Sequence, residues 1–358
     1  MIKRGDKMNK LLKIVLIMII CISVLSCQKK SKRTLYVFNW TDYIAPELIQ
    51  EFEKKYDCKI NYDTYNSNEN MLTKLMTSQA PYDIIVPSGD HVSILAQKGL
   101  LEPLDKSKLK NYANLNQVIL QKAQQFDANN QYSIPYFWGT CGLIYNKKYM
   151  PEAEMKNVSW QIIGDKRFAG KKNITMLDDA REVLGVSLIA NGFEPNNLSP
   201  ESLYKAYKTL LTWDKNISQY DSDSFKNEVQ DGTIWFGQAY NGDALQVMQE
   251  NPNVGFALPK EGSTLWIDFL VIPKNSENKE LAYQFIDFLL SASAAKENAL
   301  FVQYASPNQA AFELLPEEIR LNKNIYPDNE YLEKCFLLLN VGEEVLKVDK
   351  IWQEIRNN

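Results

Sequence analysis

The chain has 358 residues, a length that exceeds one small core and suits two compact lobes. Hydrophobic residues make up 45% and charged residues 23% of it, which is ordinary for a folded protein and excludes a largely disordered chain. The formal net charge is −4, so the composition lacks the basic excess that phosphate binding needs.

Residues 1–26 are predicted to be a lipoprotein signal peptide. Basic residues precede the apolar run Ile14–Leu25, which is too short to span a bilayer comfortably. The run ends in Val24-Leu25-Ser26-Cys27, which resembles the lipobox of bacterial lipoproteins, where the cysteine is lipidated and becomes the new N-terminus. We therefore expect a lipid anchor on Cys27, a tether over residues 27–33 and a periplasmic or otherwise extracytoplasmic location. A plain signal peptide or an uncleaved anchor is the alternative.

Cleavage at this site changes the charge of the chain. The remaining residues carry 35 Lys and Arg against 43 Asp and Glu, a net charge near −8. That excess disfavours nucleic acid as a partner and suits a cationic ligand. Translation could begin at Met1 or at Met8, since the basic flank is suitable from either.

The cysteines beyond Cys27 are Cys58, Cys141 and Cys335, and they are widely separated. Their spacing fits neither a zinc site nor a disulfide framework. We expect buried thiols and no metal site.

Hydrophobic periodicity predicts alternating strands and helices along residues 34–290. The predicted strands are 34–38, 58–65, 82–86, 141–145, 173–177, 233–239 and 264–272, and the predicted helices are 46–56, 69–76, 182–191, 201–212, 244–250 and 280–290. Alternation with short connections predicts an α/β fold with a parallel sheet covered by helices on both faces. A ligand would then lie where the strands end.

The same order predicts two lobes. We place a crossing near residue 139, where Gly139 could supply a hinge. Lobe 1 would comprise residues 34–139 and about 272–310, and lobe 2 would comprise residues 140–271 and about 311–358.

Two carboxylates, Asp179 and Glu182, lie three residues apart where a helix is expected to begin. An Asp at the N-cap with a Glu three residues later is a variant of the capping box, and both complement the helix dipole. Both can also line a ligand site, because a helix start at a strand end projects side chains into the crevice. Asp178 is then the better candidate for a purely structural cap.

Carboxylates and aromatic rings recur at the predicted strand ends, whereas Lys and Arg are nearly absent there. The candidate ligand-binding residues are Trp40, Thr41, Asp42, Tyr43, Ser88, Asp90, Asp179, Glu182, Tyr240, Asp243, Trp266, Asp268 and Tyr304. Carboxylates hold ammonium groups through charge-assisted hydrogen bonds, and ring faces attract positive charge and cover methylene groups. The set therefore indicates a flexible organic polycation. Taken singly, each tryptophan fits a core position equally well, and Asp90 and Asp243 could be helix caps.

Several motifs resemble the spermidine/putrescine-binding proteins of bacterial polyamine ABC importers. They are Val37-Phe38-Asn39-Trp40-Thr41-Asp42-Tyr43, Tyr82-Asp83-Ile84-Ile85-Val86-Pro87-Ser88, Leu104-Asp105-Lys106-Ser107-Lys108-Leu109, Ser133-Ile134-Pro135-Tyr136-Phe137-Trp138-Gly139, Asp178-Asp179-Ala180-Arg181-Glu182-Val183 and Trp266-Ile267-Asp268. Their order is preserved, and the resemblance covers nearly all of residues 34–350.

The resemblance implies a type II periplasmic-binding-protein fold, whose two α/β lobes are joined by a hinge with the ligand cleft between them. It implies a monomer that binds polyamine and delivers it to ABC permease subunits. It also implies that Asp179 and Glu182 hold a terminal amine, that Asp268 holds the inner amine of spermidine and that Trp266 stacks along the chain.

Three positions depart from the family pattern. Family members often carry Tyr at the position of Asp90 and Trp at the position of Tyr240, and Asp243 matches the putrescine-selective relatives. The preference between spermidine and putrescine therefore stays open.

Two other functions compete with transport. A surface lipoprotein that senses polyamines or adheres to host material would use the same pocket. A glycosidase would need carboxylates that flank the bond, whereas Asp179 and Glu182 lie on one side of a helix. The chain has one histidine, His91, no Gly-rich phosphate loop and no G-x-S-x-G motif, so we expect neither enzyme activity nor a cofactor.

Overall fold

The structure, a computed structural model, describes residues 33–77 and 81–357. The predicted signal peptide, the lipidation site at Cys27 and the tether up to residue 32 lie outside these residues. Within the described ranges, no helix combines the length and the apolar character needed to cross a bilayer.

The observed strands follow the predicted order closely. They are β1 (Arg33–Trp40), β2 (Cys58–Tyr65), β3 (Ile84–Ile85), β4 (Ser133–Asn146), β5 (Ile174–Met176), β6 (Ile217–Tyr220), β7 (Phe236–Tyr240), β8 (Val254–Ala257), β9 (Thr264–Val271) and β10 (Phe336–Leu337).

The helices connect and cover these strands. They are α2 (Pro46–Tyr56), α3 (Asn68–Thr77), α4 (Gly89–Gln97), α5 (Gln117–Ala123), α6 (Glu152–Met155), α7 (Ala180–Ala190), α8 (Pro200–Trp213), α9 (Phe225–Asp231), α10 (Asn241–Glu250), α11 (Lys279–Leu289), α12 (Ala292–Val302), α13 (Gln309–Leu314), α14 (Glu317–Arg320), α15 (Asn329–Leu332) and α16 (Val345–Arg356). Short 3-10 turns lie at Lys106–Lys108, Tyr112–Asn114, Ala128–Asn130, Trp160–Gly164, Lys166–Phe168 and Gly342–Glu344.

The strands form one mixed sheet among the described residues, in the order β2-β1-β3-β9-β4-β7-β5-β6, with β10 beside β9 and β8 beside β4. The expected parallel pairing is found at both ends, where β1 pairs with β2 and β3, and β5 pairs with β6 and β7. The central strands β4 and β9 are antiparallel to each other, β4 is antiparallel to β7 and β8, and β9 is antiparallel to β3 but parallel to β10. The carboxyl ends of β1, β3, β5 and β7 therefore lead into the loops that carry most of the candidate residues.

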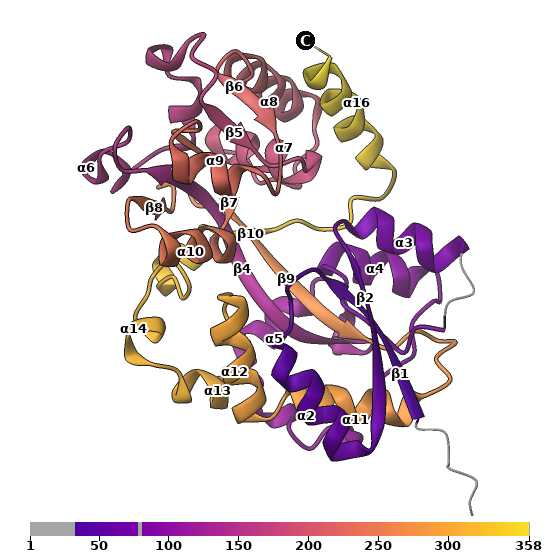
Figure 1. Ribbon diagram of the computed structural model, residues 1–358. Helices are drawn as coiled ribbons and strands as arrows, with labels where there is room; N and C mark the ends of the chain where they lie inside the picture. Colours follow the sequence, from indigo (N-terminus) through magenta and orange to yellow (C-terminus); the bar gives the residue numbers. More distant parts are fainter. Residues whose placement is uncertain (1–32, 78–80, 358) are drawn as a thin grey trace, which may run out of the picture.

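Strand β4 is shared by the two halves of the molecule (Figure 1). Its residues 133–140 pair with β9, whereas residues 141–146 pair with β7 and β8. This change of partner falls next to the predicted crossing. At Gly139 an added Cβ would collide with the Asn241 carboxamide and the Trp266 ring, so close packing accounts for the glycine, and its role as a hinge stays a prediction.

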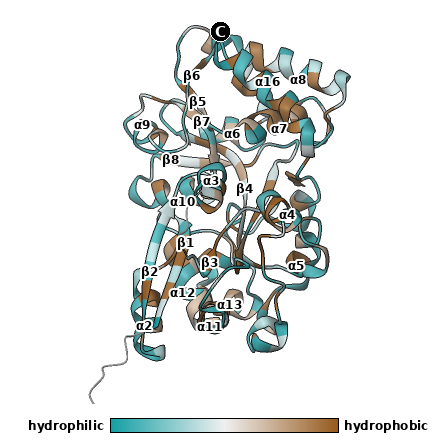
Figure 2. Ribbon diagram, turned by 90° about the vertical axis from the view of Figure 1, so that its right-hand side faces the viewer, coloured by the Kyte–Doolittle hydropathy of each residue, from teal (hydrophilic) through white to brown (hydrophobic). Residues whose placement is uncertain are grey.

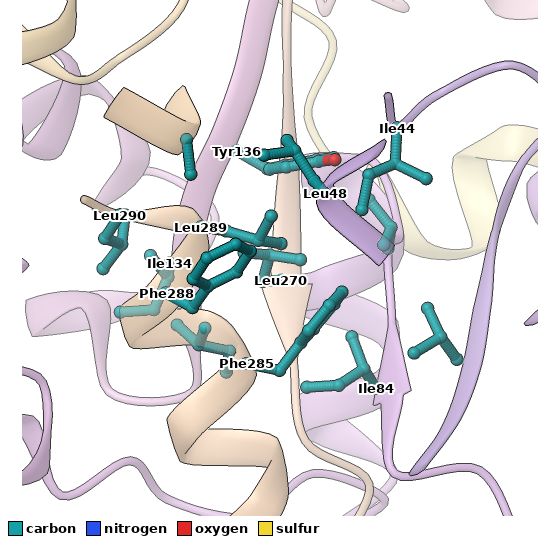
Figure 3. Close-up of a cluster of buried hydrophobic side chains, with 14 of the residues drawn as sticks. Ile44, Leu48, Ile84, Ile134, Tyr136, Leu270, Phe285, Phe288, Leu289 and Leu290 are labelled. Atoms are coloured by element: carbon teal, nitrogen blue, oxygen red, sulfur yellow. The ribbon is translucent and has the colours of Figure 1, made fainter. Parts of the chain in front are cut away.

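The first lobe is built around an apolar core between β1, β3, β4, β9 and the helices α2 and α11. Figure 3 shows Phe285, Phe288 and Leu289 of α11 pointing toward Leu48 of α2 and Ile84 of β3. Their spacing on α11 is that of one helix face. Each side chain buried to this extent contributes about 1.5–3 kcal/mol relative to exposure.

The core of the second lobe surrounds α7, which is buried on nearly every side from residue 182 to residue 189 and is coloured largely as hydrophobic in Figure 2. Trp160 and Trp213 fill the space beside it. A helix that is apolar all round must be covered on all sides, and α8 and α16 supply part of that cover. The start of α7 is therefore held rigidly.

The C-terminal segment contacts both halves of the molecule. Residues from 311 onward were expected in lobe 2, but Leu315 lies in the first-lobe core, and Ile325 packs with Phe38 and Ile85 of β1 and β3. The core of the second lobe is joined by Phe336 and Val341, which precede α16, and by Ile355 of α16. Tyr331 also donates a hydrogen bond to the Pro259 carbonyl. The bounds of the second lobe in this segment therefore stay a prediction.

Candidate functional site

Asp268 lies on β9, where the two halves of the molecule meet, and its residue is 6% exposed. Its carboxylate accepts hydrogen bonds from the Tyr43 hydroxyl at 2.6 Å and the Ser88 hydroxyl at 2.7 Å. Tyr43 follows β1, and Ser88 is the N-cap of α4. Burial raises the pKa of Asp268 to about 6. Among the described residues no basic side chain forms an ion pair with it, so its negative charge is buried against neutral donors.

A second acidic position lies at the start of α7. The Asp179 carboxylate caps this helix by accepting hydrogen bonds from the backbone N–H groups of Arg181 at 2.9 Å and Glu182 at 3.0 Å. Glu182 is 3% exposed and accepts a hydrogen bond from the Thr264 hydroxyl at 2.6 Å. The Glu182 side chain is thus directed to β9.

The electrostatics of these two carboxyl groups are coupled. Burial, and then the charge of Asp179, raise the pKa of Glu182, and burial with the charges of Glu69 and Asp90 raises the pKa of Asp179. Both groups therefore favour a cation beside them.

The assignment of Asp178 as the purely structural cap is wrong. Asp178 is exposed and pairs with the guanidinium group of Arg356, while Asp179 makes the capping hydrogen bonds. The structure thus confirms Asp179 as the cap of α7, and its role as a ligand-binding carboxylate stays a prediction.

Aromatic rings connect the two acidic positions. The rings of Trp266 and Tyr304 are perpendicular with centroids 4.7 Å apart, and Tyr240 and Tyr43 meet these two rings at 6.1 Å and 5.8 Å respectively. After burial, the charges of Asp179 and Glu182 raise the pKa of Tyr240. Rings of this kind can cover the methylene groups of a ligand whose charged ends meet the carboxylates.

Trp266 has an additional property that favours a ligand. Its ring is only partly buried, and its Nε1–H has no hydrogen-bond partner in the part of the chain that the structure describes. Thr264, Trp266 and Asp268 alternate along β9 and therefore lie on one face of the sheet. This face of β9 therefore extends from Thr264, which contacts Glu182, to Asp268.

The remaining predicted residues lie at or after the ends of β1, β3 and β7. Trp40 donates a hydrogen bond from Nε1 to the Val86 carbonyl at 2.8 Å and packs on the Tyr65 ring, which is a structural role. Thr41 and Asp42 are exposed in the loop after β1, where Asp42 has a φ of 53°. The structure thus brings Trp40 to the core and does not bring Thr41 and Asp42 into contact with the acidic positions.

Asp90 and Asp243 occupy first helical turns but are not caps. The cap of α4 is Ser88 and that of α10 is Tyr240. The Asp90 carboxylate lies 3.1 Å from His91 Nδ1, and Asp243 forms an ion pair at 3.4 Å with the ammonium group of Lys226. Asp243 therefore has a cationic partner within the protein.

Thr264, Glu69 and Lys226 were not among the predicted site residues. Thr264 could have been found, because it precedes Trp266 and Asp268 with the two-residue period of one strand face. Glu69 and Lys226 come from helices that carry no local sign of a site, and only the tertiary structure brings them close to Asp179 and Asp243.

One cavity lies away from the predicted site residues. No group of potential metal ligands is found among residues 33–77 and 81–357. A cavity of about 370 Å³ is lined by Leu75, Tyr82, Ile85 and Leu95 and by the segments 99–101 and 273–275, and includes none of the predicted site residues. No cluster of His, Cys, Asp and Glu within the described ranges suits a metal ion. Cys58, Cys141 and Cys335 are buried, as expected.

Known proteins resemble the chain over nearly its whole length. The family model described as bacterial extracellular solute-binding protein matches residues 47–325. The spermidine/putrescine-binding periplasmic protein of Salmonella typhimurium is 35% identical over 324 residues, which cover 90% of this chain and 91% of the relative.

Two crystal structures confirm the two-lobed α/β fold. The spermidine/putrescine ABC transporter substrate-binding protein PotD of Streptococcus pneumoniae has a TM-score of 0.82 at 34% identity and covers 91% of this chain and 99% of its own. The TpPotD lipoprotein of Treponema pallidum has a TM-score of 0.80 at 30% identity and covers 91% of this chain and 100% of its own.

Proposed function

The chain belongs to the bacterial extracellular solute-binding proteins and has the type II periplasmic-binding-protein fold, and on this basis we propose that it binds a polyamine, spermidine or putrescine. The relatives named for these two ligands support the proposal. The ligand would be held by Asp268, by Asp179 and Glu182, and by the rings of Trp266 and Tyr304.

Asp268 is the observation that carries this proposal. A buried carboxylate without a cation is costly, and an ammonium group placed beside it removes that cost by forming a charge-assisted hydrogen bond. The Tyr43 and Ser88 hydroxyls hold the carboxylate in place. Separate acidic positions with rings between them suit a cation whose charges are spaced along an apolar chain.

The transport role extends this proposal to partners and location. The protein would stand outside the cytoplasmic membrane, anchored through lipidated Cys27, and would deliver polyamine to an ABC permease. The predicted signal peptide supports the anchor, and so does the 30% identity to the TpPotD lipoprotein of Treponema pallidum. We propose binding and release without catalysis, because Asp179 and Glu182 share the start of α7 and cannot flank a bond as glycosidase carboxylates do.

Uptake by intact cells tests the transport role. Deleting the gene should abolish import of labelled putrescine, spermidine or both, and the wild-type gene should restore it. A variant with Asp268→Asn should accumulate normally but restore spermidine uptake less well than the wild-type gene does. Unchanged polyamine uptake in the deletion strain would contradict transport and favour the sensing or adhesive lipoprotein.

The anchor requires a separate experiment. With Cys27→Ala the protein should be recovered in the soluble extracytoplasmic fraction, whereas the wild-type protein should sediment with membranes. Recovery of both forms in the same fraction would contradict lipidation at Cys27.

A further inference from the structure

Lys226 holds one of the site carboxylates by an ion pair. Lys226 lies in the first turn of α9, and its ammonium group is 3.4 Å from Asp243 Oδ1 and 3.6 Å from Asp223 Oδ1. Its side chain is 30% exposed and that of Asp243 is 19% exposed, whereas Asp223 is almost fully exposed. The stronger of the two contacts is therefore with Asp243, where water screens the charges least.

Asp243 is directly beside the aromatic part of the candidate site. It lies in the first turn of α10, and the Tyr304 ring occupies the space that a Cβ on Gly242 would need. The charges of Asp243 and Asp268 both act on the Tyr304 hydroxyl, whose pKa is raised first by burial and then by these two carboxylates. Tyr304 thus lies between the two acidic groups.

Asp243 differs from the other acidic groups of the site. Over the described ranges, Asp268, Asp179 and Glu182 form no ion pair with Lys or Arg side chains, whereas Asp243 pairs with Lys226. A lysine side chain ends in a primary ammonium group on a four-carbon stem, which is chemically the same as one end of a diamine. The protein therefore already supplies at Asp243 the group that a ligand would bring.

Building on the proposed polyamine binding, we infer that Lys226 is a specificity-determining residue that keeps Asp243 from the ammonium groups of the ligand. A ligand ammonium approaching Asp243 must displace Lys226 or remain close to its positive charge, and both are unfavourable. The polyamines that bind best are then those whose charges are satisfied by Asp268 and by Asp179 with Glu182.

Substitution of Lys226 tests this role in the full-length protein. Lys226→Met keeps the length of the side chain and removes its charge, so calorimetric titration at pH 8 should show that putrescine, spermidine or both bind on the order of tenfold more tightly. Adding Asp243→Asn to this variant should remove the gain. Lys226→Gln provides a second neutral variant in case Lys226→Met unfolds.

Lys205→Met serves as the matched control for net charge, because Lys205 pairs with Glu201 on the surface of α8. It should leave both affinities unchanged. Equal affinities for wild type and both Lys226 variants, a gain that persists with Asp243→Asn, or an equal gain with Lys205→Met would each overturn the role of Lys226. If the wild-type protein binds neither polyamine, the proposed function fails and the inference fails with it.

Discussion

At the scale of single residues, the candidate site is characterised by Asp268, Asp179 and Glu182, whose carboxylates form no ion pair with Lys or Arg over the described ranges. Asp268 is the clearest of them, because two neutral hydroxyls hold its carboxylate while burial raises its pKa to about 6. A buried carboxylate of this kind is destabilising when it is charged and has no cation beside it. A ligand ammonium group placed beside it removes that cost. Affinity should therefore depend strongly on the charge of this one side chain.

Replacing that charge gives the first prediction. Asp268→Asn should weaken spermidine binding about ten- to hundredfold, since a hydrogen bond to a charged group is worth about 1.5–3 kcal/mol. Putrescine should lose less, because only spermidine has the inner amine assigned to Asp268. Titration calorimetry with both ligands measures this difference. Asp178→Asn, an exposed neighbour of Asp179, is the control that should not change either affinity, and equal losses for the two polyamines would contradict the assigned role.

The pKa of Asp268 gives the second prediction. Because it is raised to about 6, the carboxyl group takes up a proton as the pH falls through 6, and a protonated Asp268 offers no charge to an ammonium group. Polyamine amines stay protonated throughout this range, so affinity should fall by about tenfold between pH 7.5 and pH 5. The raised pKa of Glu182 shifts binding in the same direction. An affinity that is constant from pH 7.5 to pH 5 would contradict the role of ionised Asp268 in polyamine binding.

At the scale of elements, α7 is the helix that joins structure and site. Its N-cap, Asp179, is also a predicted ligand-binding residue, and the helix behind it is buried from residue 182 to residue 189. The cap and the ligand contact can therefore be separated by substitution, since Asn caps a helix about as well as Asp but carries no charge.

The third prediction uses that difference. Asp179→Asn should keep the free energy of unfolding and lose polyamine affinity, whereas Asp179→Ala should lose affinity and also about 0.5–2 kcal/mol of stability. Urea unfolding and titration of the two variants provide the comparison. If Asp179→Asn binds polyamine like the wild type, Asp179 is only a cap.

The hydrophobic pattern of the sequence predicted most of the helices and strands. The residues at which they begin and end show why the prediction succeeded. The helix at Pro46–Tyr56 and the strand at Cys58–Tyr65 have the predicted bounds, because Pro46 begins the helix and apolar residues follow with helical spacing. The long strand β4 was predicted only from residue 141. Its first half contains Pro135 and Gly139, residues that usually interrupt strands, and the structure accommodates Pro135 at an irregularity in the pairing with β9.

Some residues of the candidate site could be predicted from the sequence, whereas one contact between helices could not. Asp268, Asp179, Glu182 and Trp266 could be found because each follows or occupies a predicted strand. Lys226 of α9 and Asp243 of α10 are 17 positions apart in the chain, and no local pattern predicts such a contact.

At the scale of the whole molecule, the two lobes are joined through β4 and β9, which carry chain from one half of the sheet to the other (Figure 1). The acidic groups come from both sides of this junction. Asp268 bonds to Tyr43 and Ser88 of the first lobe, whereas Asp179 and Glu182 belong to α7 of the second. A ligand that contacts all of them would hold the lobes together.

The fourth prediction concerns closure of the two lobes on the ligand. Because a polyamine would bridge the lobes, its binding should favour a closed arrangement about the connecting strands. Small-angle X-ray scattering should then show a smaller radius of gyration with saturating ligand, and Asp268→Asn should show no change at the same ligand concentration. An identical radius with and without bound polyamine would contradict closure.

Polyamine binding itself is tested most directly by calorimetric titration of the purified protein with putrescine, spermidine and, as a control, glutamate. We predict saturable one-to-one binding of at least one polyamine with a dissociation constant in the micromolar range or tighter, equivalent to about −8 kcal/mol or better, and no binding of glutamate. Absence of saturable binding by both polyamines at millimolar concentration, or comparable binding of glutamate, would contradict the proposed function.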